Sequence, residues 1–184
     1  CKEAGTDFAQ ALKRAKKAAT PRQRVSDSQI DRTEQAVGRI VGSICVLTAK
    51  RGDAASAMLA SWVSQATFNP PGLTVAVAKD RAVESLTHTG DKFVLNILQE
   101  GKELRKNFMR NYAPGEDRFA NVAKEEANNG CYILKDALAY LECTIQNRME
   151  CGDHWVVYAA VENGKVLNTE GVTAVHHRKS GSHY

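Results

Sequence analysis

Short apolar runs bounded by turn residues dominate the chain from residue 38 onward. The run Ile40–Ala49 is rich in β-branched residues and predicts a strand that ends at turn residues 50–53. A second strand region, Ser56–Phe68, is rich in small residues and stops at the break Asn69–Gly72. Further strands are expected at Leu73–Ala78, Lys92–Leu98, Ala139–Arg148 and His154–Glu162. The pattern therefore predicts a mainly β domain.

Helical spacing of apolar residues is confined to a few segments. Residues 1–19 are expected to form one helix, and a short helix should end near Val37. Further helices are expected at Ala82–Thr89 and Lys102–Tyr112, a short one at Ala120–Ala127, and a hairpin turn at Asn163–Gly164. Because helical crossovers do not separate the strands regularly, we expect a mostly antiparallel barrel with inserted helices, not a doubly wound parallel sheet.

Composition narrows the function only slightly. The chain has 184 residues, 43% hydrophobic and 25% charged, with a net charge of +4, as in one ordinary folded domain. A basic stretch at 13–24 lacks the stacking aromatics of single-strand nucleic-acid binders, so a solvated helix end and linker is the favoured interpretation. No apolar run is long enough to span a membrane. We expect no nucleic-acid partner and no membrane span.

The five cysteines are irregularly spaced, which favours a reducing compartment over a disulfide framework. Cys151 and His154 lie three apart, and His176 and His177 follow downstream. Four ligands at a recognisable zinc spacing are missing, so no metal site is expected.

One stretch, residues 57–71, carries small and hydroxyl side chains where a buried strand would carry Val and Ile. Small side chains let a flat ligand approach the backbone closely. An edge strand with its hydroxyl face in water would look the same, so the pattern alone leaves both interpretations open.

The chain also resembles the flavin reductase-like split barrel over roughly residues 38–175. The motifs that carry this resemblance occur in the order of that family. They are Gly52, Ala60-Ser61, Ser64, Thr67, Pro70-Pro71, the strand Leu73–Ala78 with Lys79-Asp80-Arg81-Ala82, Val94–Leu98, Asp117-Arg118-Phe119, Leu141-Glu142-Cys143 and Gly152-Asp153-His154. Met58 and Leu59 depart from the Gly and Thr usual in the family, so a hydroxyl contact to flavin is expected to be absent there.

Residues 56–82 are most similar to the C-terminal flavin reductase module of flavodiiron (diflavin) proteins of cyanobacteria and plants. The resemblance implies that residues 1–37 are a remnant of a flavodoxin-like domain plus linker and that 38–184 form the split barrel. It implies an NAD(P)H:flavin oxidoreductase that binds FMN rather than FAD, accepts electrons from NADH or NADPH, and passes them to a flavodiiron core that reduces dioxygen to water.

The same resemblance implies partners and a location. The partners are the flavodoxin-like and diiron domains of a parent chain and a second copy in a homodimer. The location is cytoplasmic, with association at the photosynthetic membrane surface as a further option. The alternative is a non-catalytic barrel that serves as a docking or oligomerisation module.

Candidate site residues follow from the resemblance and from residue chemistry. The cofactor-binding set is Ser61, Trp62, Val63, Ser64, Gln65, Thr67, Lys79, Asp80, Arg81 and Asn96, and the catalytic residue is His154. Backbone N–H groups of Ser61–Gln65 are expected to hold the polar flavin edge, and Lys79 and Arg81 the phosphate. The alternatives are turn charges in water for these two cations, a buried amide bonded to backbone for Asn96, and a core side chain for Trp62.

Overall fold

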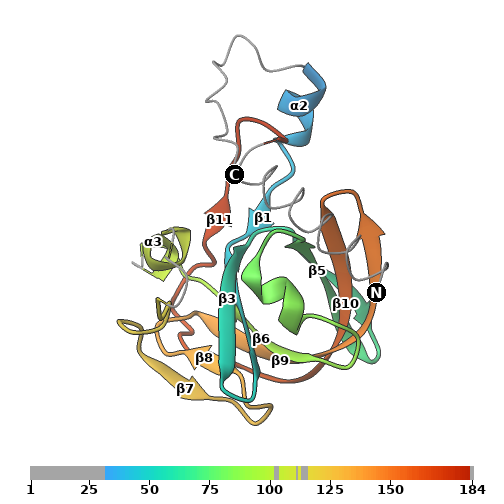
Figure 1. Cartoon of the computed structure of the whole chain (residues 1–184). Helices are drawn as coiled ribbons and strands as arrows, with labels where there is room; N and C mark the ends of the chain where they lie inside the picture. The colour runs from blue at the N-terminus through green and yellow to red at the C-terminus, as the bar shows by residue number, and fades with distance from the viewer. Residues whose placement is uncertain (1–31, 102–103, 111, 113–115, 183–184) are drawn as a thin grey trace, which may run out of the picture.

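The computed structural model describes residues 32–101, 104–110, 112 and 116–182. Its main element is a seven-stranded antiparallel sheet in the order β3-β2-β6-β9-β10-β5-β4, which curls into a barrel (Figure 1). The strands are β2 (Cys45–Arg51), β3 (Ala54–Ala60), β4 (Val63–Phe68), β5 (Pro71–Ala78), β6 (Lys92–Ile97), β9 (Ala139–Cys151) and β10 (His154–Val166). The mainly β prediction is confirmed.

The barrel is split between β3 and β4. These strands follow one another in the chain, yet they lie at opposite ends of the sheet order and do not pair with each other. The expected single strand region 56–68 is therefore two strands, separated at Ser61–Trp62. This break places two small-residue strands on either side of an opening, which is the geometry expected for a split barrel.

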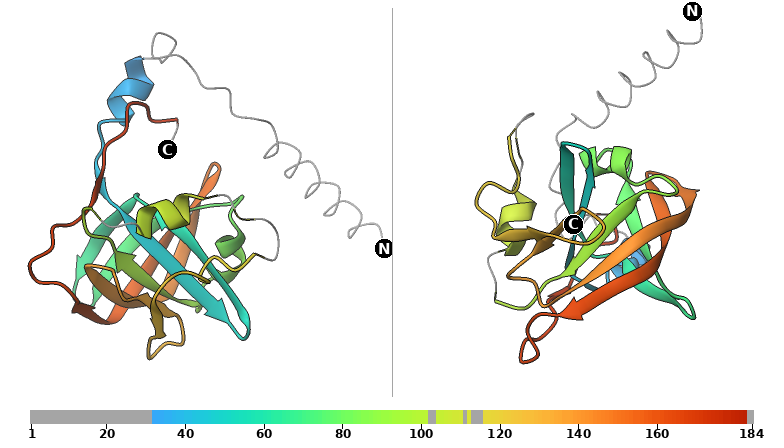
Figure 2. Two further views of the ribbon diagram at one scale, coloured as in Figure 1. Left: turned by 90° about the vertical axis from the view of Figure 1, so that its left-hand side faces the viewer. Right: turned by 90° about the horizontal axis from the view of Figure 1, so that it is seen from below.

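Smaller elements cover the outside and one end of the barrel. The strands β1 (Gly42–Ser43) and β11 (Val175–His176) pair with each other, as do β7 (Lys124–Glu126) and β8 (Tyr132–Leu134). Three helices are described: α2 (Arg32–Val37), the 3-10 helix η2 (Ala82–Leu86) and α3 (Leu104–Met109). Figure 2 shows α2 and the returning C-terminal segment together at one end of the molecule.

The main core fills the barrel. Side chains on one face of each strand point inward because strand residues alternate between faces, and Leu47, Val75, Phe93 and Val157 are all fully buried there. The helix η2 adds Val83 to this core. A second cluster, which includes Ile44, lies between the outside of the barrel and α3. β2 is consequently covered on both faces, which explains its continuous apolar run.

Two of the predicted elements are wrong. Residues 120–127 do not form a helix but contain turns and β7. Asn163–Gly164 is not a hairpin turn, because β10 continues through it with a register shift next to Asn163. The Asn163 amide donates to Glu142 Oε1 over 3.0 Å on β9, so its side chain is used across the sheet. The tight turns are instead Gly52-Asp53 and Gly152-Asp153, each with glycine at φ +58.

Three other predicted helices are confirmed in the described part of the chain, two of them over fewer residues than expected. The segment expected at 82–89 is helical only over Ala82–Leu86, and the segment expected at 102–112 is helical over Leu104–Met109. The short helix ending at Val37 is confirmed as α2. The helix expected at 1–19 and the linker after it lie outside the described residues.

Candidate functional site

The candidate site lies at the break between β3 and β4. Ser61 and Trp62 leave the strand conformation, while the Trp62 carbonyl still accepts a hydrogen bond from Ala76 N–H at 3.0 Å. Ser61 is buried, and the backbone of Gly42 lies directly against its carbonyl. A β-carbon on residue 42 would lie 1.8 Å from that oxygen, so only glycine permits this contact. The chain is thereby held in one bent conformation at the opening of the barrel.

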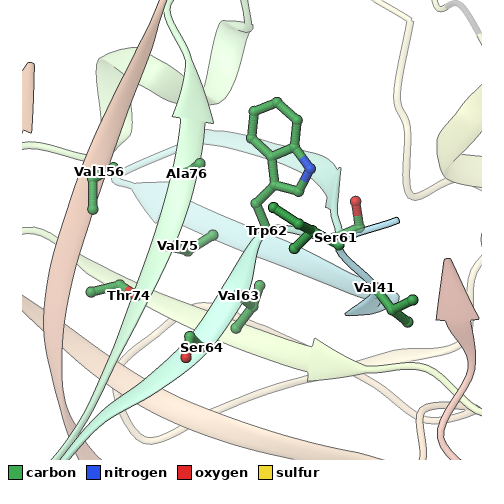
Figure 3. Close-up of a pocket in the computed structure, with 10 residues that line it drawn as sticks. Val41, Ser61, Trp62, Val63, Ser64, Thr74, Val75, Ala76 and Val156 are labelled. Atoms are coloured by element: carbon green, nitrogen blue, oxygen red, sulfur yellow. The ribbon is translucent and has the colours of Figure 1, made fainter. Parts of the chain in front are cut away.

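A cleft of about 470 Å³ lies beside this bend (Figure 3). Its size falls within the usual range of small-molecule sites. It is formed by Ile40, Val41, Ser61, Trp62, Val63, Ser64, Thr74, Val75, Ala76 and Val156. Most of these side chains are small or apolar, with hydroxyl groups at Ser61, Ser64 and Thr74. The cleft therefore offers an apolar surface with a few polar groups, which is how small-molecule sites are usually composed.

Four of the predicted residues, Ser61, Trp62, Val63 and Ser64, line this cleft. β4 is an end strand of the sheet, so every second backbone N–H points away from β5. Because the Trp62 carbonyl faces β5, the alternation directs the Val63 N–H toward the open edge. No described strand pairs with this edge of β4, so the Val63 N–H is available there for the polar edge of a ligand.

His154 does not line the cleft itself but contacts Trp62, which does. Their rings lie 4.8 Å apart between centroids at an angle of 41°. His154 is the first residue of β10 after the Gly152-Asp153 turn, and its Nδ1 lies 2.7 Å from Asp153 Oδ1. This contact fixes the orientation of the imidazole, because the carboxylate holds one ring nitrogen. Trp62 is thus neither a core residue of the barrel nor a solvated one, but one border of the cleft.

The C-terminal segment supplies polar groups that the sequence prediction missed. His176 Nδ1 lies 3.3 Å from Ser61 Oγ, and the Arg178 guanidinium lies 5.1 Å from the centre of the Trp62 ring. Burial, with the positive charges of Arg105, Arg178 and His177, lowers the pKa of His176. These surroundings therefore favour the neutral form of the His176 imidazole.

Gln65 and Thr67 lie further along β4 and do not line the cleft. The Thr67 hydroxyl donates to the Pro70 carbonyl at 2.6 Å, and the Gln65 amide donates to the Thr67 carbonyl at 3.4 Å. Both side chains therefore serve the turn that leads from β4 into β5.

The charged residues after β5 are also outside the cleft lining. Lys79 is bound by the Glu150 carboxylate and donates to the Gly152 carbonyl at 2.6 Å. Arg81 lies 3.7 Å from Asp80, and both side chains are about half exposed. Of the two predicted phosphate ligands, Lys79 is therefore bonded to the hairpin at residues 150–153, whereas the Arg81 side chain is half exposed to solvent.

Asn96 lies away from the cleft and is completely buried. Its amide donates to the carbonyls of Val46 and Tyr132 at 3.3 and 3.2 Å, and its oxygen accepts from Leu134 N–H at 2.8 Å. These bonds tie β2 and β6 to β8. The structure shows the buried, backbone-bonded amide that was the alternative interpretation, so we leave Asn96 out of the candidate site.

The sequence prediction missed one side of the cleft. Thr74, Ala76 and Val156 line it from β5 and β10, and Ile40 and Val41 from the segment before β1. A usable signal exists in β5, where Thr74 and Ala76 interrupt the larger residues at every second position. For Ile40 and Val41 the apolar pattern predicts a strand, and nothing in it indicates a ligand-facing position.

Two absences concern the described residues alone. In that part of the chain, no three His, Cys, Asp or Glu side chains gather closely enough to hold a metal ion. Among the same residues, no helix has the length and apolar character that crossing a membrane requires.

Comparisons with known proteins agree with this geometry. Residues 37–182 match the flavin reductase like domain family. The chain is 69% identical over 186 residues to diflavin flavoprotein A 6 of Nostoc, and 56% identical to diflavin flavoprotein A 1 of Synechocystis. Each match covers all of this chain and 32% of the relative, so the chain spans about a third of the length of these relatives.

Solved structures show the same fold. The NADH:FAD oxidoreductase SgcE6 of Streptomyces globisporus superimposes with a TM-score of 0.73 at 23% identity, over 85% of this chain and 93% of that one. The flavin reductase PheA2 superimposes with a TM-score of 0.62 at 25% identity, over 77% of this chain and 88% of that one. The split-barrel prediction is confirmed. The chain belongs to the flavin reductase-like domain family and corresponds to the flavin reductase module of the cyanobacterial diflavin flavoproteins.

Proposed function

We propose that this chain is an NAD(P)H:flavin oxidoreductase module that binds FMN in preference to FAD. The observation that carries the proposal is the cleft beside the Ser61–Trp62 bend, with its apolar surface, its hydroxyl groups and the unpaired edge of β4. Support comes from relatives named diflavin flavoproteins and from solved neighbours described as an NADH:FAD oxidoreductase and as a flavin reductase complexed with NADP+.

The residues present fit a flavin. Val63 and Val156 offer apolar surface for a planar ring, while Ser61 and Ser64 offer hydroxyl groups and the Val63 N–H a donor for its polar edge. Ala76 leaves space where a larger side chain would fill the cleft. A bound flavin supplies the two-electron chemistry, and the protein supplies binding, orientation and electrostatics.

The chain's own residues would orient the reactants and exclude water. Trp62 lines the cleft, and its indole packs against the tilted ring of His154. Asp153 fixes His154, so this imidazole presents a defined face and a defined polar nitrogen to a nicotinamide. Hydride exchange between two ring systems needs no general base. We therefore assign His154 a contact with the substrate and no obligatory proton transfer.

The role in a larger protein is part of the same proposal. The relatives are about three times as long as this chain, and their matched part corresponds to the barrel described here. We propose that electrons pass from the cleft to flavodoxin-like and diiron domains of a parent chain, which reduces dioxygen to water. We place residues 1–37 as the end of the preceding domain plus linker, and 38–184 as the barrel domain.

We also propose that two copies of this chain form a homodimer. Ile40 and Val41 line the cleft, yet 66% and 51% of their surfaces are exposed. Apolar side chains at the rim of a ligand site are a typical position for a subunit contact. Light scattering of the wild-type protein and of Ile40→Lys tests this: we expect a dimer and its weakening, whereas a wild-type monomer would contradict it.

The central test compares two tryptophan substitutions on neighbouring exposed residues of β4. Ser64 lines the cleft and Gln65 does not, so Ser64→Trp should fill the cleft while Gln65→Trp should leave it open. We expect the wild type and Gln65→Trp to bind FMN and to lose flavin absorbance when NADH or NADPH is added without oxygen. Ser64→Trp should bind at least about tenfold more weakly, since it removes the apolar contact area of the ring. A wild-type protein that acquires no flavin spectrum would overturn the proposal.

A further inference from the structure

The C-terminal segment, residues 175–182, returns across the barrel to the bend that borders the cleft. β11 pairs with β1 through Val175–Ser43 and His176–Gly42. Beyond it, Gly181 N–H donates to the Glu34 carbonyl at 2.7 Å, so α2 also holds the segment. Between these two anchors, Arg178 is positioned over Trp62. The segment is thus a built part of the site and brings a cation to its border.

Two guanidinium groups near this border contain buried donors with no hydrogen-bond partner among the described residues. They are Arg178 Nη1 and Arg105 Nε. Neither side chain forms an ion pair with an acid in the described part of the chain. A buried donor left without an acceptor is costly, and a charged one more so. Such donors are normally satisfied by a ligand, by water or by a partner.

The two arginines belong to one positive region. The positive charges of both arginines act on His176 of the segment, and the charge of His177 adds to them. The Glu34 carboxylate of α2, which holds the end of the segment, accepts hydrogen bonds from Ser182 and Ser180, at 2.8 and 3.3 Å. Positive charges that form no ion pair with an acid among the described residues favour an anion.

We propose that Arg178, which lies over Trp62 at the border of the cleft, and Arg105, whose charge acts on His176, bind the phosphate of a nucleotide ligand, a role that rests on the proposed function. A guanidinium presents parallel N–H donors that match phosphate oxygens, and these charge-assisted bonds would satisfy the unpaired donors. Trp62 lines the cleft, so a phosphate held beside it would belong to a molecule whose ring lies inside. The phosphate can come from the flavin or from the nicotinamide dinucleotide.

Calorimetric titration separates the two sources with three probes. FMN carries a flavin phosphate, riboflavin carries none, and ADP-ribose carries the diphosphate of the dinucleotide without its nicotinamide. We expect Arg178→Gln and Arg105→Gln each to weaken at least one phosphate-bearing probe by about tenfold, the equivalent of one charge-assisted hydrogen bond, with riboflavin unchanged. Loss confined to FMN assigns the flavin phosphate, and loss confined to ADP-ribose assigns the dinucleotide.

Lys179→Gln is the matched control, because it removes the same charge from the next residue. It should bind all three probes within about twofold of the wild type, the size of a screened surface effect. Arg178→Lys retains the charge but not the paired donors, and it should show an intermediate loss. If Arg178→Gln does not fold, the lysine variant decides.

The proposal is overturned if the arginine variants bind FMN and ADP-ribose as the wild type does, or if Lys179→Gln loses as much. It is overturned equally if the wild type binds no phosphate-bearing probe. The proposed function fails in other ways. Either the wild type acquires no flavin spectrum, or it holds flavin that NADH and NADPH leave oxidised, whatever the arginine variants do with ADP-ribose.

Discussion

The His176 imidazole lies 3.3 Å from the Ser61 hydroxyl, which joins the last strand of the chain to the bend between β3 and β4. The two residues are 115 positions apart in sequence. Through this contact the C-terminal segment and the cleft form one unit. A change in the protonation of His176 should therefore affect the bend that contains Ser61.

The pKa of His176 should make the native protein less stable in mild acid. Burial and the charges of Arg105, Arg178 and His177 lower this pKa below the usual 6.5. The native state thus binds this proton less readily than the unfolded chain, so the contribution to stability is present above pH 6.5 and is lost as the pH falls through the lowered pKa. We expect the melting temperature to fall less between pH 7.5 and pH 5.5 in His176→Asn than in the wild type.

A proton NMR titration measures the same quantity directly. The His176 resonance is identified as the imidazole signal that is missing from His176→Asn. A midpoint at or above 6.5 would contradict the prediction.

Gly42 should tolerate no side chain. Because a β-carbon there would meet the Ser61 carbonyl oxygen, Gly42→Ala must displace either β1 or the bend. We expect a loss of about 1–3 kcal/mol in the free energy of unfolding, typical of overpacking, together with weaker flavin binding. Ser43→Ala on the same strand is the control and should change neither by much. Urea unfolding and a flavin titration provide the two readouts, and an unchanged Gly42→Ala would refute the close contact.

Lys79 and Arg81 should have separable roles. Lys79 is paired with Glu150, whereas Arg81 is half exposed beside Asp80. We expect Arg81→Gln to weaken FMN by about tenfold and riboflavin hardly at all, since only FMN offers a phosphate. Lys79→Gln should instead lower the melting temperature and affect both flavins alike. Equal losses for FMN and riboflavin in Arg81→Gln would remove Arg81 from the phosphate site.

Asn96 should matter for stability and not for the flavin. Asn96→Leu leaves the Leu134 N–H without its buried partner, while the Tyr132 carbonyl keeps the hydrogen bond from the Thr48 hydroxyl. We expect a loss of about 1–3 kcal/mol in the free energy of unfolding, the usual cost of an unsatisfied buried group. Flavin affinity measured at a temperature where the variant is folded should stay within about twofold, the scatter expected for a distant site. A selective loss of flavin would return Asn96 to the site.

Cysteine reactivity should follow burial. Burial raises the pKa of the Cys45 and Cys143 thiols to about 12 and also raises that of Cys131. At pH 8 these groups are therefore protonated and shielded, and the thiolate is the reactive form. We expect iodoacetamide to leave them unmodified in the native protein and to modify them in urea, as read by peptide mass spectrometry. Cys151, which is partly exposed, should be modified without urea.

Local sequence patterns were sufficient to predict most strands and the small, hydroxyl-bearing side chains of the bend. Alternation and turn residues predict most of the barrel, and the small residues around Ser61 indicate an unusual site, because these are local properties of the chain. The family motifs specify the split barrel within the mainly β class, since they reflect the whole domain.

Which of these residues contact one another depends on the tertiary structure. It brings His176 and Arg178 to Ser61 and Trp62, and it assigns Asn96 to the backbone of β8. In the tertiary structure β10 continues through Asn163, because the Asn163 amide donates a hydrogen bond to Glu142 on β9 and the residue does not form a turn. Contacts between residues far apart in sequence depend on strand order and register, and neither is encoded in local periodicity.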